Sequence, residues 1–382
     1  MKPQTLPLNP SFSSGPCPKY LGWSLNNIKL DTIGRSHRSK IGKNHLKYCI
    51  EETKNLLNLP KDYILGILPG SDTGAFEIAL WNILGSRKVD VLAWESFGYD
   101  WVNDITNELK ILDTRIFRAP YGKISDLDQV NFNNDIVFTW NGTTSGVCLP
   151  DVNWIDPSRK GLTICDATSA IFTVDIDWSK IDVLTFSWQK ALGGEGGHGM
   201  IVLSPKAILH IDSYKPSWPI PKLFNLKKSN KLNLGIFEGL TINTPSMVAV
   251  EEWLSILEWA KSNGGLKYLK SKTMENFEII EDFCKKNNWI GFLAESETYR
   301  SKTSVCLKFI DPWFLSLEET KKIENVDKFL YILESNKAAY DIKNYRTAPL
   351  GLRIWCGPTV EKSDLKILTQ WLSYGWEKIF QK

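Results

Sequence analysis

The sequence predicts an α/β fold, with a large domain built on a mostly parallel β-sheet followed by a smaller α+β domain. Three observations lead to this prediction. The chain has 382 residues, which is too long for one ordinary domain. Over the first two-thirds, short apolar runs alternate with segments long enough for helices, the pattern of βαβ units. The last third instead mixes long helical patterns with a few short strands.

The elements of the large domain follow in chain order. Residues 1–20 are rich in proline and serine and are expected to form an extended arm outside the core. Helical spacing of apolar residues runs from about Ser39 to Leu59, where Pro60 ends it. The apolar runs that we interpret as strands are Tyr63–Leu68, Val89–Trp94, Ile136–Trp140, Leu162–Cys165 and Val183–Phe186.

A second domain is expected to begin near residue 260. A loop region with several prolines leads into a helix from about Ser246 to Lys261, which the Gly264–Gly265 pair ends. We therefore predict an arm over 1–20, a large cofactor-binding domain over 21–260 and a small domain over 261–382. Within the small domain we expect helices at Tyr268–Lys285, Lys321–Ser335 and Lys362–Lys378, and strands at Ser304–Lys308 and Gly351–Cys356.

Composition excludes several classes of function. Lys and Arg number 46 against 43 Asp and Glu, and the resulting charge of +3 argues against a nucleic-acid partner. The seven cysteines are widely spaced without a CxxC pair, so neither a disulfide framework nor a metal site is expected. The chain shows no apolar leader and no apolar run of membrane-spanning length, so we expect a cytoplasmic protein without a membrane partner.

The first chemical motif is a turn of small residues, Leu68–Glu77, between a predicted strand and an apolar helix. Backbone N–H groups at such a helix start can receive a phosphate, helped by the hydroxyl of Ser71 or Thr73. The alternative is an ordinary turn in which Asp72 or Thr73 caps the helix. This motif alone does not decide between the two.

The second motif is Asp166, an acid at the tip of a strongly apolar strand. Burying a carboxylate there is costly unless a cation meets it, and a protonated pyridine nitrogen is such a cation. The alternative is an aspartate that caps the next turn through its own backbone.

The third motif is Lys190, which follows another apolar strand and is followed at once by glycines. Desolvation by Trp188, Ala191 and Leu192 would lower its pKa, as an amine that traps an aldehyde requires. The glycines would let a bulky cofactor approach the backbone. The alternative of a surface lysine is disfavoured because Asp166 lies one βαβ step upstream, so that acid and lysine emerge at neighbouring strand ends.

These residues belong to a wider set of motifs that resembles the phosphoserine aminotransferases, in the branch typical of alphaproteobacteria. The likeness runs from about residue 3 to residue 375. It implies the type I fold of pyridoxal phosphate (PLP)-dependent transferases, with a seven-stranded sheet in the large domain. The motifs that carry it are NPSFSSGPC, GRSHRSK, SDTGAFE, FTWNGTTSG, CDATSA, FSWQKALGGE, EGLTINTPSM and YRTAPLGLRIWCG.

The resemblance assigns roles to particular positions. Lys190 matches the lysine that forms the imine with PLP, and Asp166 matches the partner of the pyridine nitrogen. Arg38, Arg346 and Arg353, with Tyr345 beside them, match the substrate-binding group. Asn243 and Thr244 match a pair that reaches the cofactor phosphate of a neighbouring subunit, which implies a homodimer with shared active sites. The other cofactor contacts implied are Asp72, Thr73, Phe97, Thr143 and Gln189.

Two positions depart from the better-known branch of that family. Phe97 stands where that branch has a tryptophan on the cofactor ring, with Trp94 and Trp101 close by in sequence. Tyr345–Arg346 stands where it has a His-Arg pair, and one extra residue separates this pair from Arg353.

The activity that the resemblance implies is reversible amino transfer from L-glutamate to 3-phosphohydroxypyruvate, giving O-phospho-L-serine and 2-oxoglutarate, a step of L-serine biosynthesis. The phosphorylated four-carbon keto acid of pyridoxine biosynthesis is a second candidate substrate. One alternative is another enzyme of the same fold, such as a serine–glyoxylate aminotransferase or a cysteine desulfurase. The other is a non-enzymatic module that binds a nucleotide phosphate at the Gly70–Gly74 turn, although that turn lacks the usual nucleotide motifs.

Overall fold

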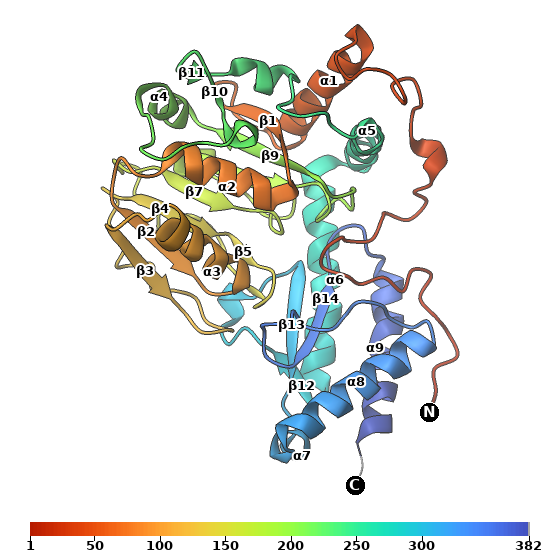
Figure 1. Ribbon diagram of the computed structural model, residues 1–382. Coiled ribbons are helices and arrows are strands. Elements are labelled where there is room, and N and C mark those ends of the chain that lie inside the picture. The colour runs from red at the N-terminus through yellow and green to blue at the C-terminus, as the bar shows by residue number, and fades with distance from the viewer. Residues whose placement is uncertain (381–382) are drawn as a thin grey trace.

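A seven-stranded sheet forms the centre of the computed structural model, which describes residues 1–380 (Figure 1). Its order is β1-β9-β8-β7-β4-β2-β3, and only β9 runs against the others. The mostly parallel, seven-stranded sheet is thereby confirmed. The strands are β1 (Ile64–Pro69), β2 (Val89–Ala93), β3 (Thr114–Arg118), β4 (Asp135–Thr139), β7 (Thr163–Asp166), β8 (Val183–Ser187) and β9 (His198–Leu203).

Two of these strands escaped the sequence analysis, each for a physical reason. The edge strand β3 is half-exposed and carries arginines, so it lacks the apolar run of a central strand. The strand β9 follows a glycine-rich turn, which we had interpreted only as part of the lysine motif.

Helices cover both faces of the sheet and give two apolar cores. On one face lie α2 (Ser71–Ile83), α3 (Ser96–Asn103) and α4 (Pro205–Ser213), and on the other α1 (Lys40–Leu56) and α5 (Met247–Ser262). The strands alternate accordingly, since Ile136 and Phe138 enter one core and Val137 enters the other. Within residues 1–380, no helix has both the length and the apolar character needed to cross a bilayer.

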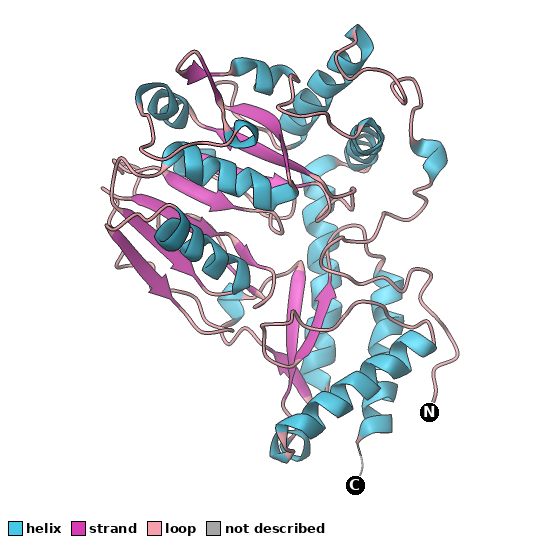
Figure 2. Ribbon diagram, viewed as in Figure 1, coloured by secondary structure: helices cyan, strands magenta, loops and turns pink. Residues whose placement is uncertain are grey.

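A second, antiparallel sheet lies below the large one, as the separate group of strands in Figure 2 shows. It consists of β12 (Ile290–Phe292), β13 (Ser304–Phe309) and β14 (Gly351–Trp355). The predicted helices occur where expected, as do the strands β13 and β14. The sequence did not predict β12 or the short helix α7 (Pro312–Ser316). The helices packed with this sheet are α6 (Gly265–Lys286), α8 (Glu319–Ser335) and α9 (Lys362–Ile379). Short strand pairs elsewhere are β5 (Asn141–Gly142) with β6 (Val147–Cys148), and β10 (Lys227–Lys228) with β11 (Lys231–Leu232).

The amino-terminal arm is extended, as predicted, but the expectation that it lies outside the core is wrong. Phe12 is 0% exposed, and its carbonyl accepts a hydrogen bond from the Trp355 backbone N–H at 2.9 Å. Asp364 on α9 accepts the backbone N–H groups of Leu8 and Asn9 at 2.8 and 3.1 Å. The arm is held because the small sheet and α9 satisfy its backbone groups, which its proline-rich composition could not reveal.

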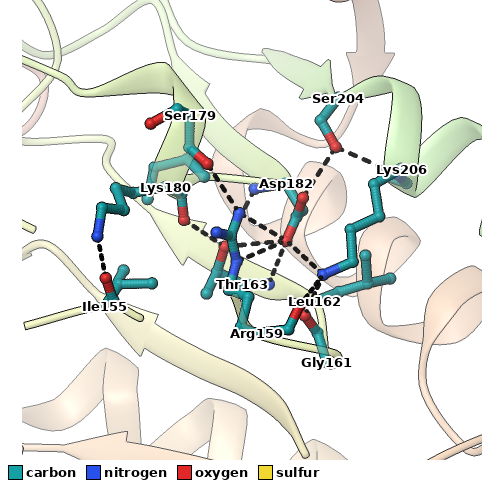
Figure 3. A network of polar contacts seen from close by, with 12 residues as sticks. Ile155, Arg159, Gly161, Leu162, Thr163, Ser179, Lys180, Asp182, Ser204 and Lys206 are labelled. Carbon is teal, nitrogen blue, oxygen red and sulfur yellow. Dashed lines mark hydrogen bonds and ion pairs between the residues drawn. The ribbon is translucent and has the colours of Figure 1, made fainter. Parts of the chain in front are cut away.

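A buried ion pair connects β7, β8 and β9 at the end of the sheet that lies opposite Lys190 (Figure 3). Asp182, just before β8, pairs with Arg159 at 3.1 Å, and both side chains are almost fully buried. The same carboxylate accepts the Thr163 backbone N–H at 3.0 Å, at the start of β7, and the Ser204 hydroxyl at 3.0 Å, just after β9. The Asp182 carboxylate therefore connects β7, β8 and β9 at the end of the sheet opposite the one that carries Lys190.

We predict that Asp182→Ala lowers the free energy of unfolding by about 3–5 kcal/mol, because it leaves the Arg159 charge buried without a partner. Urea unfolding measures the change. Asp113→Ala is the matched control, since its ion pair with Lys88 is exposed and is worth at most about 1 kcal/mol. Equal, small effects of the two substitutions would contradict the structural role assigned to Asp182.

Candidate active site

The three strand-end motifs lie together at the carboxyl ends of the parallel strands, which we call the carboxyl edge of the sheet. Both β1 and β8 pair antiparallel with β9, so they point in the same direction, and β7 runs parallel to β8. The turn after β1, Asp166 at the end of β7 and Lys190 after β8 therefore lie together at the carboxyl edge. This is the edge at which open α/β sheets bind ligands.

Lys190 is half-buried, and its Nζ donates a hydrogen bond to the Ser14 carbonyl at 2.6 Å. Burial lowers the pKa of Lys190 below its usual value, and the nearby Arg353 charge acts in the same direction. The contact with Ser14 joins residues 176 positions apart. The sequence does not predict a role for Ser14, because the composition of the arm indicates a segment outside the core. The apolar residues Phe12 and Cys17 were the one indication that part of the arm is buried.

Two glycines near Lys190 have close neighbours that leave no room for a side chain. Gly193 has φ +70, and a Cβ there would lie 2.3 Å from the Pro18 carbonyl oxygen. A Cβ on Gly15 of the arm would lie 2.3 Å from Lys190 Nζ. Both glycines allow the arm to pack closely against the turn that carries the lysine.

Asp166 is 3% exposed and makes two hydrogen bonds to donors of this chain. Its Oδ1 accepts the Thr168 backbone N–H at 3.0 Å, and its Oδ2 accepts Trp101 Nε1 at 3.3 Å. The turn-capping interpretation is therefore correct as far as it goes. Among residues 1–380, however, no cation lies within ion-pair distance of this carboxylate, which leaves its charge available for a cationic ligand.

Asp72, which the resemblance assigns to the phosphate-binding turn, is 6% exposed, and its carboxyl group lies in hydrogen-bond contact with Asp166. What remains for a phosphate are the free N–H groups at the start of α2, where Gly70 has φ +85 and no side chain caps the helix. Thr73 is exposed in this first turn, as a phosphate-binding hydroxyl requires.

The other predicted cofactor contacts surround this edge. Thr143 is buried, with its hydroxyl 2.6 Å from that of Ser169. Gln189 Oε1 is buried and has no hydrogen-bond partner among the described residues. Phe97 is half-buried, with its ring centroid 5.6 Å from that of Tyr345. Of the aromatic residues considered for ring stacking, Trp94 and Trp101 are both buried, and Trp101 is already bound to Asp166.

Arg353 brings a positive charge from β14 to the lysine. Its Nε is buried and has no hydrogen-bond partner in the described part of the chain, and no carboxylate there forms an ion pair with it. Its guanidinium carbon lies 5.7 Å from the centroid of the Tyr345 ring, and that of Arg346 lies 5.6 Å from the same centroid. Arg346 is exposed, whereas Arg353 is partly buried.

Three predicted residues do not join this group within one chain. Arg38, Asn243 and Thr244 are exposed and make only local hydrogen bonds. Arg38 precedes α1, and the other two precede α5. These helices pack side by side in the same direction, since His45 contacts Glu251 and Glu52 contacts Lys261. All three residues therefore lie at the same end of the α1–α5 pair.

Comparison with known proteins identifies the family. No family model matches the chain. The chain is 56% identical over 379 residues to the phosphoserine aminotransferase of Methanosarcina mazei, covering 99% of this chain and all of that protein. It is 55% identical, over the same shares, to that of Methanosarcina barkeri. The chain belongs to the phosphoserine aminotransferase family. The alphaproteobacterial branch stays a prediction.

Solved structures support the fold of a phosphoserine aminotransferase. The one from Cytophaga hutchinsonii matches with a TM-score of 0.81 at 21% identity, covering 96% of this chain and 98% of that one. A pyridoxamine–pyruvate aminotransferase from Mesorhizobium loti matches with a TM-score of 0.82 at 14% identity, covering 100% and 95%. The predicted fold of PLP-dependent transferases is confirmed, and as a phosphoserine aminotransferase the protein is a PLP-dependent transaminase.

The residues of this phosphoserine aminotransferase fit PLP. A buried carboxylate without a cation suits the ring nitrogen, and uncapped N–H groups with an exposed threonine suit the phosphate. A half-buried lysine with a lowered pKa suits the aldehyde. Gln189 Oε1 and Arg353 Nε, buried and without partners within residues 1–380, show where further polar ligand groups belong.

We predict that Lys190→Ala lowers the rate of transamination by more than about a hundredfold, because no other residue of the motif Ser187–Gly194 carries an amine that could hold the cofactor or move the proton. Steady-state turnover with phosphoserine measures the loss. Lys206→Ala is the control, since this lysine is also partly buried and has a lowered pKa but lies beside Asp182 at the opposite edge. Turnover above about a hundredth of the wild-type rate in Lys190→Ala would refute the assignment.

Proposed function

We propose that this site transfers an amino group reversibly between L-glutamate and 3-phosphohydroxypyruvate, giving O-phospho-L-serine and 2-oxoglutarate for L-serine biosynthesis. The observation that carries the proposal is the grouping of Lys190, Asp166 and the unpaired Arg353 at the carboxyl edge of the sheet. Such a group provides an amine, an acid for a ring nitrogen and a cation for a substrate carboxylate.

Each residue has a task in this reaction. Bound PLP supplies an electron sink for the substrate carbanion. Lys190 holds the cofactor and then moves the proton at the substrate Cα, for which a lowered pKa is suitable. Asp166 meets the positive ring nitrogen. The start of α2 with Thr73 and Gln189 would hold the phosphate, Phe97 would contact the ring, and Thr143 would lie near the ring oxygen.

The arginines divide the recognition of two anions. Arg353 is partly buried beside Lys190, which suits it to the α-carboxylate that every amino acid substrate carries. Arg346 is exposed beside Tyr345, which suits it to the distal anion, either the phosphate of phosphoserine or the side-chain carboxylate of glutamate. One pocket then serves both half-reactions.

A homodimer with shared active sites would explain why three predicted residues do not join the group around Lys190 within one chain. Arg38, Asn243 and Thr244 are exposed at one end of the α1–α5 pair, and the apolar side chains of Leu240 and Val248 beside them are 48% exposed. Contact between two copies would cover this surface and bring Asn243 and Thr244 to the other copy's cofactor phosphate. Arg38 would enter the distal-anion pocket from the partner subunit.

We also place the protein in the cytoplasm. All seven cysteines are free, and six of them are buried, as is usual for proteins of a reducing compartment.

The first prediction of this proposal concerns the arginines. Arg346→Ala should lower kcat/KM for phosphoserine and for glutamate together, by about 1.5–3 kcal/mol each, because both substrates lose a charged hydrogen-bond donor to their distal anion. Arg353→Ala should also impair alanine, which has no distal anion. The values of kcat/KM for phosphoserine, glutamate and alanine on both variants measure this. If Arg346→Ala impairs alanine as much as phosphoserine, the division of tasks is wrong.

The second prediction concerns the dimer. Dilution to monomers should release PLP and activity together, since Asn243 and Thr244 of each subunit complete the other's site. Sedimentation velocity with absorbance detection of bound PLP follows both quantities at once. A substitution in the exposed loop, Asn243→Ala, should weaken PLP binding without changing the unfolding midpoint. A fully active monomer that retains PLP would contradict shared sites.

A further inference from the structure

The proposed reaction gives no role to the buried carboxyl group of Asp72. It lies in the first turn of α2, which packs closely on β9 because Gly199 has no side chain there. A Cβ on Gly199 would lie 2.2 Å from the Ser71 carbonyl oxygen. The close approach brings Asp72 into hydrogen-bond contact with Asp166 from β7.

Two carboxyl groups in direct contact, both almost fully buried, cannot both be charged and must share one proton. The other donors decide which group keeps the charge. Asp166 accepts the Thr168 backbone N–H and Trp101 Nε1, and both bonds favour its anionic form. Oδ1 of Asp72, by contrast, has no hydrogen-bond partner among the described residues. The proton therefore belongs on Asp72.

The electrostatics of the surroundings agree with this assignment. Burial, followed by the adjacent Asp166, raises the pKa of Asp72 well above its usual value. Burial also raises the pKa of Asp166, but the hydrogen bond from Asp72 acts in the opposite direction, as do those from Thr168 and Trp101. Lys190 is the basic group that faces both carboxyls, and its charge lowers the pKa of each.

We propose that Asp72 is a positioning residue of the cofactor site: its neutral carboxyl group donates a hydrogen bond to Asp166 and holds Asp166 as the anion that meets the ring nitrogen of PLP. This inference rests on the role proposed above for Asp166. Without the donor, burial favours the protonated form of Asp166, which attracts a cationic ring less strongly.

Another role for an acid in this position is to stabilise the start of α2 through its negative charge. The two roles make opposite demands. A helix-dipole role needs a charge, which Asn lacks, whereas the proposed role needs a hydrogen-bond donor, which the Asn side chain keeps. Asp72→Asn and Asp72→Leu therefore separate the roles, because both remove the charge and only Leu removes the donor.

The experiment measures the dissociation constant of PLP by absorbance titration of the full-length apo-protein, with the unfolding midpoint and kcat of each variant alongside. Asp72→Leu should weaken PLP binding by about tenfold or more, the usual effect of losing a hydrogen bond to a charged group. Asp72→Asn should recover most of that loss. Glu77→Gln and Glu77→Leu on the same helix are matched controls, since Glu77 is a partly buried acid without contact to Asp166.

Infrared spectroscopy of the apo-protein gives a second readout that is independent of activity. The wild-type spectrum minus that of Asp72→Asn should contain the carbonyl band of a protonated carboxylic acid at about pH 8, well above the ordinary range for an aspartate. The corresponding difference for Glu77→Gln should contain none. Asp72→Ala replaces Asp72→Leu if the latter does not fold.

Three outcomes would overturn the proposal. The first is unchanged PLP binding in both Asp72→Leu and Asp72→Asn, and the second is an equal loss of stability in both with no effect on PLP, which would indicate the helix-dipole role. The third is a missing acid band. If instead Asp166→Asn leaves PLP binding and activity unchanged while the band is present, the role of Asp166 has failed, and the contact between Asp72 and Asp166 stands.

Discussion

The structure depends on a buried carboxylate that the chain leaves without a cation. Asp166 ends β7, in the middle of the sheet, where water is excluded and a free negative charge is unfavourable. Within residues 1–380 it has hydrogen-bond donors in Thr168 and Trp101, the contact with Asp72 and, beyond ion-pair distance, the charge of Lys190. A carboxylate in this position would gain stability if a cationic ring bound beside it, which is the role proposed above for Asp166.

Buried carboxylates at the two ends of the sheet differ in whether the chain itself provides all of their partners. At the amino edge, Asp182 is just as buried, but Arg159, Thr163 and Ser204 satisfy its oxygens, and the result is a structural clamp. At the carboxyl edge, Asp166, Gln189 and Arg353 keep polar atoms or charges that no group of the described chain neutralises. Stability is concentrated where partners are complete, and binding capacity where they are missing.

The small domain and the arm complete the site from outside the large sheet. The arm places the Ser14 carbonyl on Lys190, and β14 places Arg353 beside it. The same segments are held together by backbone bonds between Phe12 and Trp355, so arm, lysine and arginine form one assembly. The small sheet and the arm therefore set the surroundings of Lys190 and of Arg353 together.

The sequence by itself determined the alternation of strands and helices, the strand-end positions of Asp166 and Lys190, and the family. These are local features, because apolar periodicity and contiguous motifs are set by neighbours in the chain. Only the tertiary structure decided that Phe12 is a core residue, that Asp72 lies against Asp166, and that Arg38 stands apart from Arg353. Each of these depends on segments that are distant in sequence and meet only when the sheet, the arm and the small domain pack, as in the contact of Lys190 with Ser14 across 176 positions.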